Sequence, residues 1–208
     1  MKGCLSFIIK TIIAILVFFG LLHIGAIDWI KDRIYEYQNP SQEKMVEQAK
    51  DIIDLSEIDD EYSINKNLKV LKHRMIMAEH NATGQKMIMV EPNKEDILTK
   101  EDIQSKEIEN RLENAAKKYS NKLIQFESIK VVKKGQFKGI NQTIPYAKVE
   151  VEISNLPIKN QVGIIGVAEL ENGKNLIIMS ANEKGKYSQI IAEGFYEKIK
   201  YCKNNMKN

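Results

Sequence analysis

The chain has 208 residues, of which 43% are apolar, 28% charged and 7% aromatic, and its formal net charge is +3. These values exclude a disordered tail, a collagen-like repeat and a disulfide-rich mini-protein. Lys2 and Lys10 account for 2 of the 31 basic groups, so residues 28–208 carry 29 basic and 28 acidic groups. A nearly neutral domain lacks the basic field that nucleic-acid binding requires, so we expect no nucleic acid among the partners.

The N-terminal segment has the composition of a membrane anchor. Residues 11–27 contain no formally charged side chain, and the apolar character extends back to Leu5. A stretch of this length crosses a bilayer as a helix. Lys2 and Lys10 precede it, whereas the residues after it carry mixed charges, so the positive-inside rule places the N-terminus in the cytoplasm and the rest outside. We therefore predict a single-pass cell-membrane protein that contacts the membrane through residues 5–27.

A cleaved secretory signal is the alternative interpretation of the same segment. Two lysines, an apolar run and the small residues Gly25 and Ala26 form such a signal, and the product would be a secreted domain. Ile24 is bulky where a small residue is preferred, and Trp29 lies where an interfacial aromatic residue anchors a span. These two residues favour the uncleaved anchor.

The next residues predict a helix followed by a polar linker. Asn39 and Pro40 suit the start of a helix, and an apolar stripe follows at helical spacing, which predicts an amphipathic helix of about 15 residues. Its members are Met45, Val46, Ala49, Ile52 and Ile53. The acidic run at residues 54–61 lacks the ligand spacing of a calcium loop and is interpreted as solvated linker. The predicted organisation is a membrane anchor or signal peptide at 1–30, a helical linker at 31–60 and an exported domain at 61–208.

A β-hairpin is predicted from two apolar runs, residues 67–80 and 85–91, on either side of the turn Asn81-Ala82-Thr83-Gly84. The glycine suits a type I turn with a G1 bulge, which would pair Asn81 with Gln85. In that register four methionines share one face of the hairpin: Met75, Met77, Met87 and Met89.

The remaining elements alternate in type. Thr99 and Asp102 resemble a capping box at the start of a long helix, roughly residues 99–120. Strands are predicted at residues 123–132, 143–154, 162–170 and 175–181, with Asn172-Gly173 joining the last two through a type I′ turn. The strand at 143–154 alternates apolar and charged residues, so one of its faces is buried. A final helix begins after Ser188 and carries an apolar stripe: Ile190, Ile191, Phe195, Ile199 and Cys202.

This order predicts an α+β fold, with an antiparallel sheet of about six strands flanked by helices and preceded by one N-terminal transmembrane helix. The ββ-α-ββββ-α order, and especially the ending ENGKNLIIMSANEKGKYSQIIAEGFYEKIKY, resembles the sheet and last helix of the Mog1/PsbP-like sandwich over about residues 68–202. That resemblance implies a mostly non-enzymatic accessory or binding module, and it assigns no functional residue.

Few residues are candidates for chemistry. Four thioethers on one hairpin face would suit a soft ion such as Cu(I), which makes Met75, Met77, Met87 and Met89 metal-ligand candidates, although methionine is more often a core filler. No nucleotide-binding, zinc or nucleophile motif occurs in the sequence. Seven lysines between Lys117 and Lys138 would contact anionic lipid or an acidic partner, or protect a strand edge.

We therefore expect a non-enzymatic, single-pass membrane-anchored protein with no cofactor, whose exported domain binds an unknown protein or small ligand. The alternatives are a secreted, signal-cleaved form of the same domain, and an enzyme with an unrecognised carboxylate site. A deep cleft with converging polar side chains would favour the enzyme, and a shallow apolar patch or an exposed strand edge would favour the binding module.

Overall fold

The computed structural model describes residues 42–50, 52–70, 73–92, 98–119, 125–154, 160–170 and 172–201. The predicted span at 5–27, the predicted helix start at Asn39-Pro40 and the thiol of Cys202 lie outside these residues. Within the described ranges, no helix combines the length and the apolar composition that crossing a bilayer requires.

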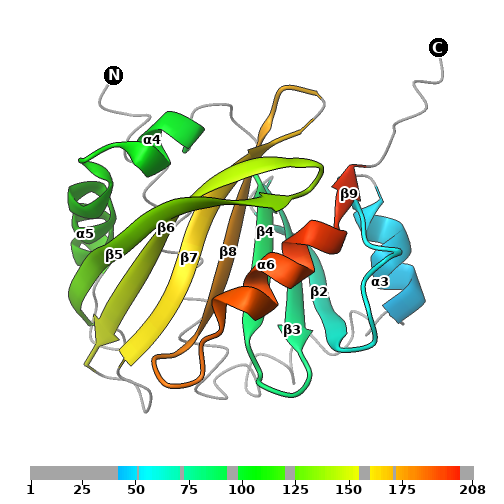
Figure 1. The fold of residues 1–208 in the computed structure, drawn as a ribbon, viewed down its shortest axis with the longest axis horizontal. Coiled ribbons are helices and arrows are strands. Elements are labelled where there is room, and N and C mark those ends of the chain that lie inside the picture. Colours follow the sequence, from blue (N-terminus) through cyan, green and yellow to red (C-terminus); the bar gives the residue numbers. More distant parts are fainter. Residues whose placement is uncertain are drawn as a thin grey trace.

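The described elements follow the chain as strands and helices in alternating groups (Figure 1). They are α3 (Gln42–Ala49), β1 (Ile53–Asp54), β2 (Tyr62–Val70), β3 (His73–His80), β4 (Lys86–Glu91), α4 (Lys100–Gln104), α5 (Ile108–Tyr119), β5 (Phe126–Gly139), β6 (Gln142–Ile153), β7 (Asn160–Glu169), β8 (Asn175–Glu183), α6 (Gln189–Lys198) and β9 (Lys200–Tyr201).

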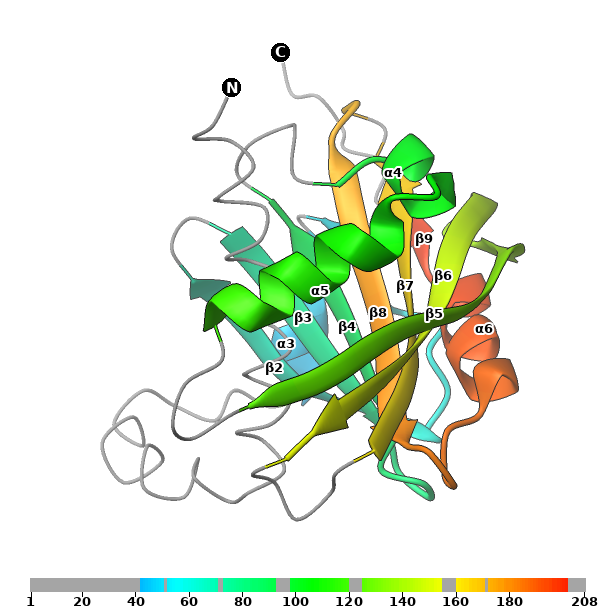
Figure 2. The ribbon, with the colours of Figure 1, turned by 90° about the vertical axis from the view of Figure 1, so that its left-hand side faces the viewer.

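Seven of the strands form one antiparallel sheet in the order β2-β3-β4-β8-β7-β6-β5, and β1 pairs with β9 in a separate two-stranded sheet. Figure 2 shows α5 lying across the strands on one face of the large sheet, with α6 on the other face. The α+β class and the antiparallel sheet are thereby confirmed. Covering both faces with helices buries the apolar side chains that project from each side of the strands.

The sheet has one strand more than the sequence predicted. The run at residues 67–80 was interpreted as a single strand, but it contains the end of β2 and all of β3, which pair with each other so that Val70 lies opposite His73. The extra strand begins at Tyr62, directly after the predicted linker. An apolar run has no internal mark of a reversal when both arms are strand-forming, so the turn between the arms was missed.

Part of the predicted linker belongs to the folded domain. Met45 and Ala49 of α3 are buried, as are Ile53 and Leu55 after it, and all four pack in the same core as α6. The helix ends at Ala49, earlier than predicted, and the chain goes on to form β1. Residues 42–55 are therefore not a spacer.

The register of the β3–β4 hairpin differs by one residue from the prediction. The amide N–H of His80 donates to the carbonyl oxygen of Gln85 at 2.9 Å, so the loop has four residues and Gly84 has a φ of 68°. Met77 consequently lies opposite Ile88, and Met89 lies opposite Ile76. Side chains alternate between the two faces along a strand, so a shift of one residue places the side chains of one strand on the face opposite to the predicted one.

The four methionines therefore do not share a face, and that prediction is wrong. Met75 and Met77 pack on the side of α5, whereas Met87 and Met89 pack on the side of α6. All four are buried, with between 0% and 7% of each residue exposed. Their role is to fill the two cores, so the soft-metal candidate is removed.

Two helix predictions need smaller corrections. The capping box of Thr99 and Asp102 is confirmed, but the helix that it starts ends at Gln104 and a second helix begins at Ile108. Of the predicted stripe, Phe195 in α6 and Ile199 just after the helix are buried, whereas Ile190 is 82% exposed; Tyr196, which the prediction left out, is buried. The apolar face of α6 is thus rotated relative to the predicted stripe.

The type I′ turn lies at a different hairpin from the one predicted. The loop between β7 and β8 is closed by a bond of 2.7 Å from Leu170 N–H to the Lys174 carbonyl, and within it only Gly173 has a positive φ among the described residues. It is therefore not a type I′ turn. The turn between β5 and β6 has this type, because both central residues, Ile140 and Asn141, have positive φ values of 49° and 56°.

Ile140 is an unusual residue for a left-handed conformation, since a branched side chain collides with the backbone there. The fold compensates in two ways: Ile140 is fully buried, and its N–H donates to the Tyr196 carbonyl oxygen near the end of α6 at 2.9 Å. That carbonyl belongs to the last helical turn, where partners within the helix run out. The hairpin tip and the end of α6 therefore hold each other in place.

The strain at Ile140 predicts an inverted order of stability for two substitutions. Ile140→Ala and Ile140→Gly both lose the buried side chain, but glycine tolerates the positive φ, so Ile140→Gly is expected to be the more stable by about 1 kcal/mol. Urea unfolding of both variants measures the difference. At Ile144, which is equally buried without a positive φ, glycine is expected to be the less stable by about 0.5–1 kcal/mol. The same order at both positions would contradict this account.

Candidate binding cavity

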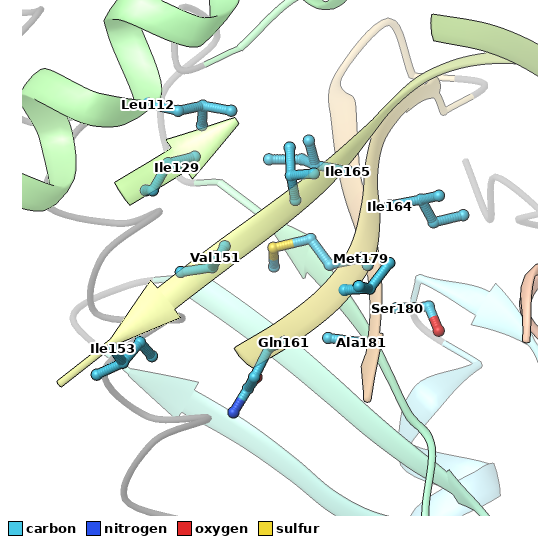
Figure 3. A pocket seen from close by; sticks show the side chains of 13 residues that line it. Leu112, Ile129, Val151, Ile153, Gln161, Ile164, Ile165, Met179, Ser180 and Ala181 are labelled. Atoms are coloured by element: carbon cyan, nitrogen blue, oxygen red, sulfur yellow. The ribbon is translucent and has the colours of Figure 1, made fainter. Parts of the chain in front are cut away.

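A small apolar cavity lies between α5 and the β5–β8 part of the sheet. Its volume is about 40 Å³, and one helix and four strands contribute its lining: Leu112, Ile129, Val149, Val151, Ile153, Gln161, Val162, Gly163, Ile164, Ile165, Met179, Ser180 and Ala181. Figure 3 shows the labelled side chains of Leu112, Ile129, Val151, Ile165 and Met179 around it, with Gln161 pointing away from them. The cavity is partly open to solvent at this side of the sheet.

The floor of the cavity is a row of small residues that crosses three strands. Val149 of β6 lies opposite Gly163 of β7, which lies opposite Ala181 of β8. The neighbouring row on the same face carries larger side chains, with Ile165 opposite Met179. The row of small side chains lies beside a row of larger ones, and this difference in size leaves a trough. Helix α5 lies across the strands and therefore passes over the trough (Figure 2).

Gly163 itself is required by the backbone. A Cβ atom at this position would lie 2.3 Å from the carbonyl oxygen of Ser180, a distance that real Cβ atoms do not reach. The close approach of β7 to β8 therefore excludes any side chain here. The pairing of β7 with β8 therefore requires that position 163 of the trough carry no side chain.

Polar contacts to the edge strand position α4 and α5 above the sheet. The Glu109 carboxylate of α5 accepts a hydrogen bond of 2.6 Å from the backbone N–H of Val131. Lys134 of β5 donates to the carbonyl oxygens of Gln104 and Ser105, at the end of α4, at 3.3 and 2.5 Å. These bonds hold the roof of the cavity at β5.

The chemistry of the lining is that of a binding hollow. No lining residue is charged, and Ser180 already accepts a hydrogen bond of 2.9 Å from the buried amide of Gln85 on the other face. Gln161 is half-buried and is the one amide side chain of the lining. An uncharged hollow of this kind holds apolar groups by burial and orients them by one polar contact.

Buried polar side chains elsewhere in the described ranges hold the fold together. The Gln85 amide donates to the Ser188 carbonyl at 2.8 Å and accepts from the Ser188 N–H at 2.8 Å. Asn182 donates to the Thr83 carbonyl at 3.1 Å. The β3–β4 hairpin, β8 and the start of α6 are thereby joined, and these groups are committed to that role.

A second polar cluster lies where α6 begins beside β6. Gln189 donates to the Tyr146 hydroxyl at 2.8 Å and to the Glu193 carboxylate at 2.7 Å.

The Tyr187 hydroxyl is buried and has no hydrogen-bond partner within the described part of the chain. Burial, with a smaller effect from Glu193, raises the pKa of Tyr187 well above its usual value. The Tyr187 hydroxyl is therefore neutral, and its burial without a partner among the described residues is unfavourable for folding.

The sequence-predicted candidates lie apart from the cavity. None of the four predicted metal-ligand methionines is among its lining residues, and the methionine that does line it, Met179, was not singled out. Within the described ranges, no cluster of three or more His, Cys, Asp or Glu side chains has metal-binding geometry. Lys130, Lys133 and Lys138 lie on β5, which is an edge strand of the sheet. Lysine on an edge strand opposes pairing with another chain.

One sequence signal for the cavity was available. Gly163 and Gly166 interrupt the apolar run of β7, and an isolated glycine in a strand marks a close backbone approach. The signal predicts a tight strand contact but gives no position for a helix above it. None of the protein-family models searched matches the chain, and no curated protein matches it.

Proposed function

We propose that the chain is a non-enzymatic, single-pass membrane-anchored protein whose exported α+β domain binds a protein or small ligand through the cavity beneath α5. The observation that supports the binding role is the lining, which contains no charged residue and includes one amide side chain, that of Gln161. General acid–base or nucleophilic catalysis needs titratable groups that converge on a substrate. A hollow lined by aliphatic side chains favours retention of an apolar group instead.

The membrane role rests on residues 5–27 and on the short distance in sequence to the folded domain. Only residues 28–41 separate the predicted span from α3. With the N-terminus in the cytoplasm, the domain would lie outside the cell close to the membrane surface. The resemblance of residues 68–202 to the Mog1/PsbP-like sandwich supports an accessory or binding role and stays a prediction.

Site-specific photo-crosslinking in native membranes tests both parts of the proposal. A photo-reactive residue at Gln161, at the mouth of the cavity, is expected to capture a discrete partner or ligand. The same residue at Ile190, which is exposed on α6 on the other face, is the matched control and is expected to capture none. Equal capture from both positions, or none from Gln161, would contradict the binding role.

Fractionation of the same cells tests the anchor. The full-length chain is expected to stay with the membrane pellet after alkaline extraction, and an added protease is expected to reach the domain from outside. A full-length chain that is soluble without detergent would contradict anchoring. Mass spectrometry of the mature N-terminus separates the secreted alternative, because signal cleavage after Ala26 would leave a chain that begins at Ile27.

A further inference from the structure

A second, larger hollow lies between the tip of the β5–β6 hairpin and the C-terminal end of α6. Its volume is about 310 Å³, which is at the lower limit of the range typical of small-molecule sites. Figures 1 and 2 both show the hairpin tip beside the end of α6. The polar residues of its lining are Lys138, Asn141, Gln142, Thr143, Glu197 and Lys200.

Close backbone contacts fix the wall that the hairpin supplies. The Ile140 N–H donates to the Tyr196 carbonyl oxygen at 2.9 Å, and a Cβ atom at Gly139 would lie 3.0 Å from the same oxygen. Ile140 and Asn141 both have a positive φ, a conformation that is unfavourable for a branched residue such as isoleucine. Strained backbone of this kind persists where the surrounding packing holds it, and it is concentrated at functional sites. The turn therefore holds Asn141 at the hollow in a fixed conformation.

The charged and amide side chains around the hollow differ in whether they already have partners. The Gln142 amide is committed to two hydrogen bonds with the backbone of β7, and Lys200 forms an ion pair with Glu57. Lys138 and Glu197 form no ion pair, either with each other or with any other residue of the described ranges. Two unpaired charges of opposite sign thus line one hollow.

This pair of charges selects a class of ligand. A ligand with one charge would be attracted by one of the two side chains and repelled by the other, whereas a zwitterion is attracted by both. Glu197 lies in the last turn of α6, where the helix dipole favours a cation and disfavours the carboxylate. A cationic group bound at Glu197 would therefore be favoured by the side chain and by the helix.

We propose that the hollow between the β5–β6 hairpin and the end of α6 is a binding site for a small zwitterion. Its anionic group contacts Lys138, and its cationic group contacts Glu197. The Asn141 amide and the Thr143 hydroxyl, which make no side-chain hydrogen bond within the described part of the chain, are able to donate to the anionic group. This site is separate from the cavity beneath α5, so the inference goes beyond the proposed function and does not depend on it.

A titration of the full-length chain in an uncharged maltoside detergent, followed by NMR of the backbone amides, tests the class of ligand. The zwitterionic probe is γ-aminobutyrate, and butyrate and butylammonium keep the same chain with one charge each. We expect γ-aminobutyrate to give saturable shifts at Asn141 and Thr143 and to bind about threefold more tightly than either other probe, since an exposed ion pair contributes modestly. Equal binding of all three probes, or no saturable shift with γ-aminobutyrate, would overturn the inference.

Two substitutions of exposed side chains assign the contacts. Lys138→Gln is expected to remove the advantage of γ-aminobutyrate over butylammonium, and Glu197→Gln is expected to remove its advantage over butyrate. Lys130→Gln is the matched control, because Lys130 is exposed on the same strand and does not line the hollow. An equal loss of affinity in Lys130→Gln would show a general effect of charge and would contradict the site. Surface substitutions of this kind change stability little, so all three variants are expected to fold.

The same titration identifies the source of the zwitterion. A carboxylate and the phosphodiester of a lipid headgroup are both anionic groups that suit Lys138. Glycerophosphoethanolamine, the soluble headgroup of a zwitterionic lipid, is therefore compared with γ-aminobutyrate. Tighter binding of glycerophosphoethanolamine assigns the site to a lipid headgroup, and weaker binding assigns it to a free solute that resembles an amino acid. If neither probe binds, the hollow is not a zwitterion site.

Discussion

Replacing Gly163 with alanine is expected to lower the free energy of unfolding by about 3 kcal/mol, because the added methyl group has no space. Its Cβ would lie 2.3 Å from the Ser180 carbonyl oxygen and 3.1 Å from the Ala181 Cβ, both on the neighbouring strand β8. The obstacle is backbone in a central pair of strands, so β7 and β8 must separate. Urea unfolding monitored by circular dichroism measures the change.

Gly185→Ala is the matched control for this substitution. Gly185 lies in the turn between β8 and α6, has no positive φ, and would have no atom within 4 Å of an added Cβ. Its stability is expected to change by less than about 0.5 kcal/mol. Alanine is ordinarily preferred to glycine inside a strand, so a stable Gly163→Ala variant would show that β7 and β8 are not as close as described.

Replacing Tyr196 with alanine is the second change with a large expected effect, a loss of about 3–5 kcal/mol in unfolding free energy. Tyr196 is fully buried, and its ring lies 5.2 Å from that of Phe195 and 6.0 Å from that of Phe137. Its hydroxyl donates to the carbonyl oxygens of Met179 at 2.6 Å and Ile88 at 3.2 Å. The side chain thus links α6 to β8 and β4 in the middle of the sheet.

Two conservative variants separate the ring from the hydroxyl. Tyr196→Phe keeps the ring and loses the hydrogen bonds, and it is expected to cost about 1 kcal/mol. Tyr187→Phe removes a buried hydroxyl that has no partner among the described residues, and it is expected to stabilise the protein by about 1 kcal/mol. Chemical unfolding of both variants measures whether the unfolding free energy falls, as expected for Tyr196→Phe, or rises, as expected for Tyr187→Phe. A destabilised Tyr187→Phe variant would show that the Tyr187 hydroxyl is satisfied.

Local patterns allowed several elements to be predicted accurately. The alternation of apolar and charged residues at 143–154 predicted β6 to within a residue at each end, and Ala147, Val151 and Ile153 do face the α5 side. The capping box of Thr99 and Asp102 forms as predicted. Each of these signals involves residues within about one helical turn or one strand, so no distant contact is needed to produce it.

The candidate site was not predictable in the same way. The lining joins Leu112 to residues as far along the chain as Ala181, and it forms because a small-residue row in three strands aligns under a helix. The glycine at position 163 was visible in the sequence, but its partners across β6 and β8 were not. Strand registers depend on loop lengths and on which face is buried, and one residue of slip changes every contact.

The sequence by itself determined the apolar N-terminal segment, the near-neutral charge of the rest and the α+β class, since these follow from composition and local periodicity. Only the tertiary structure decided that the methionines divide between two cores, that residues 42–55 join the domain and that Ile140 takes a left-handed conformation. The physical reason is that, in each of these cases, a local conformational preference competes with the burial of residues that are distant in the sequence. Such a balance is settled by the packed core as a whole.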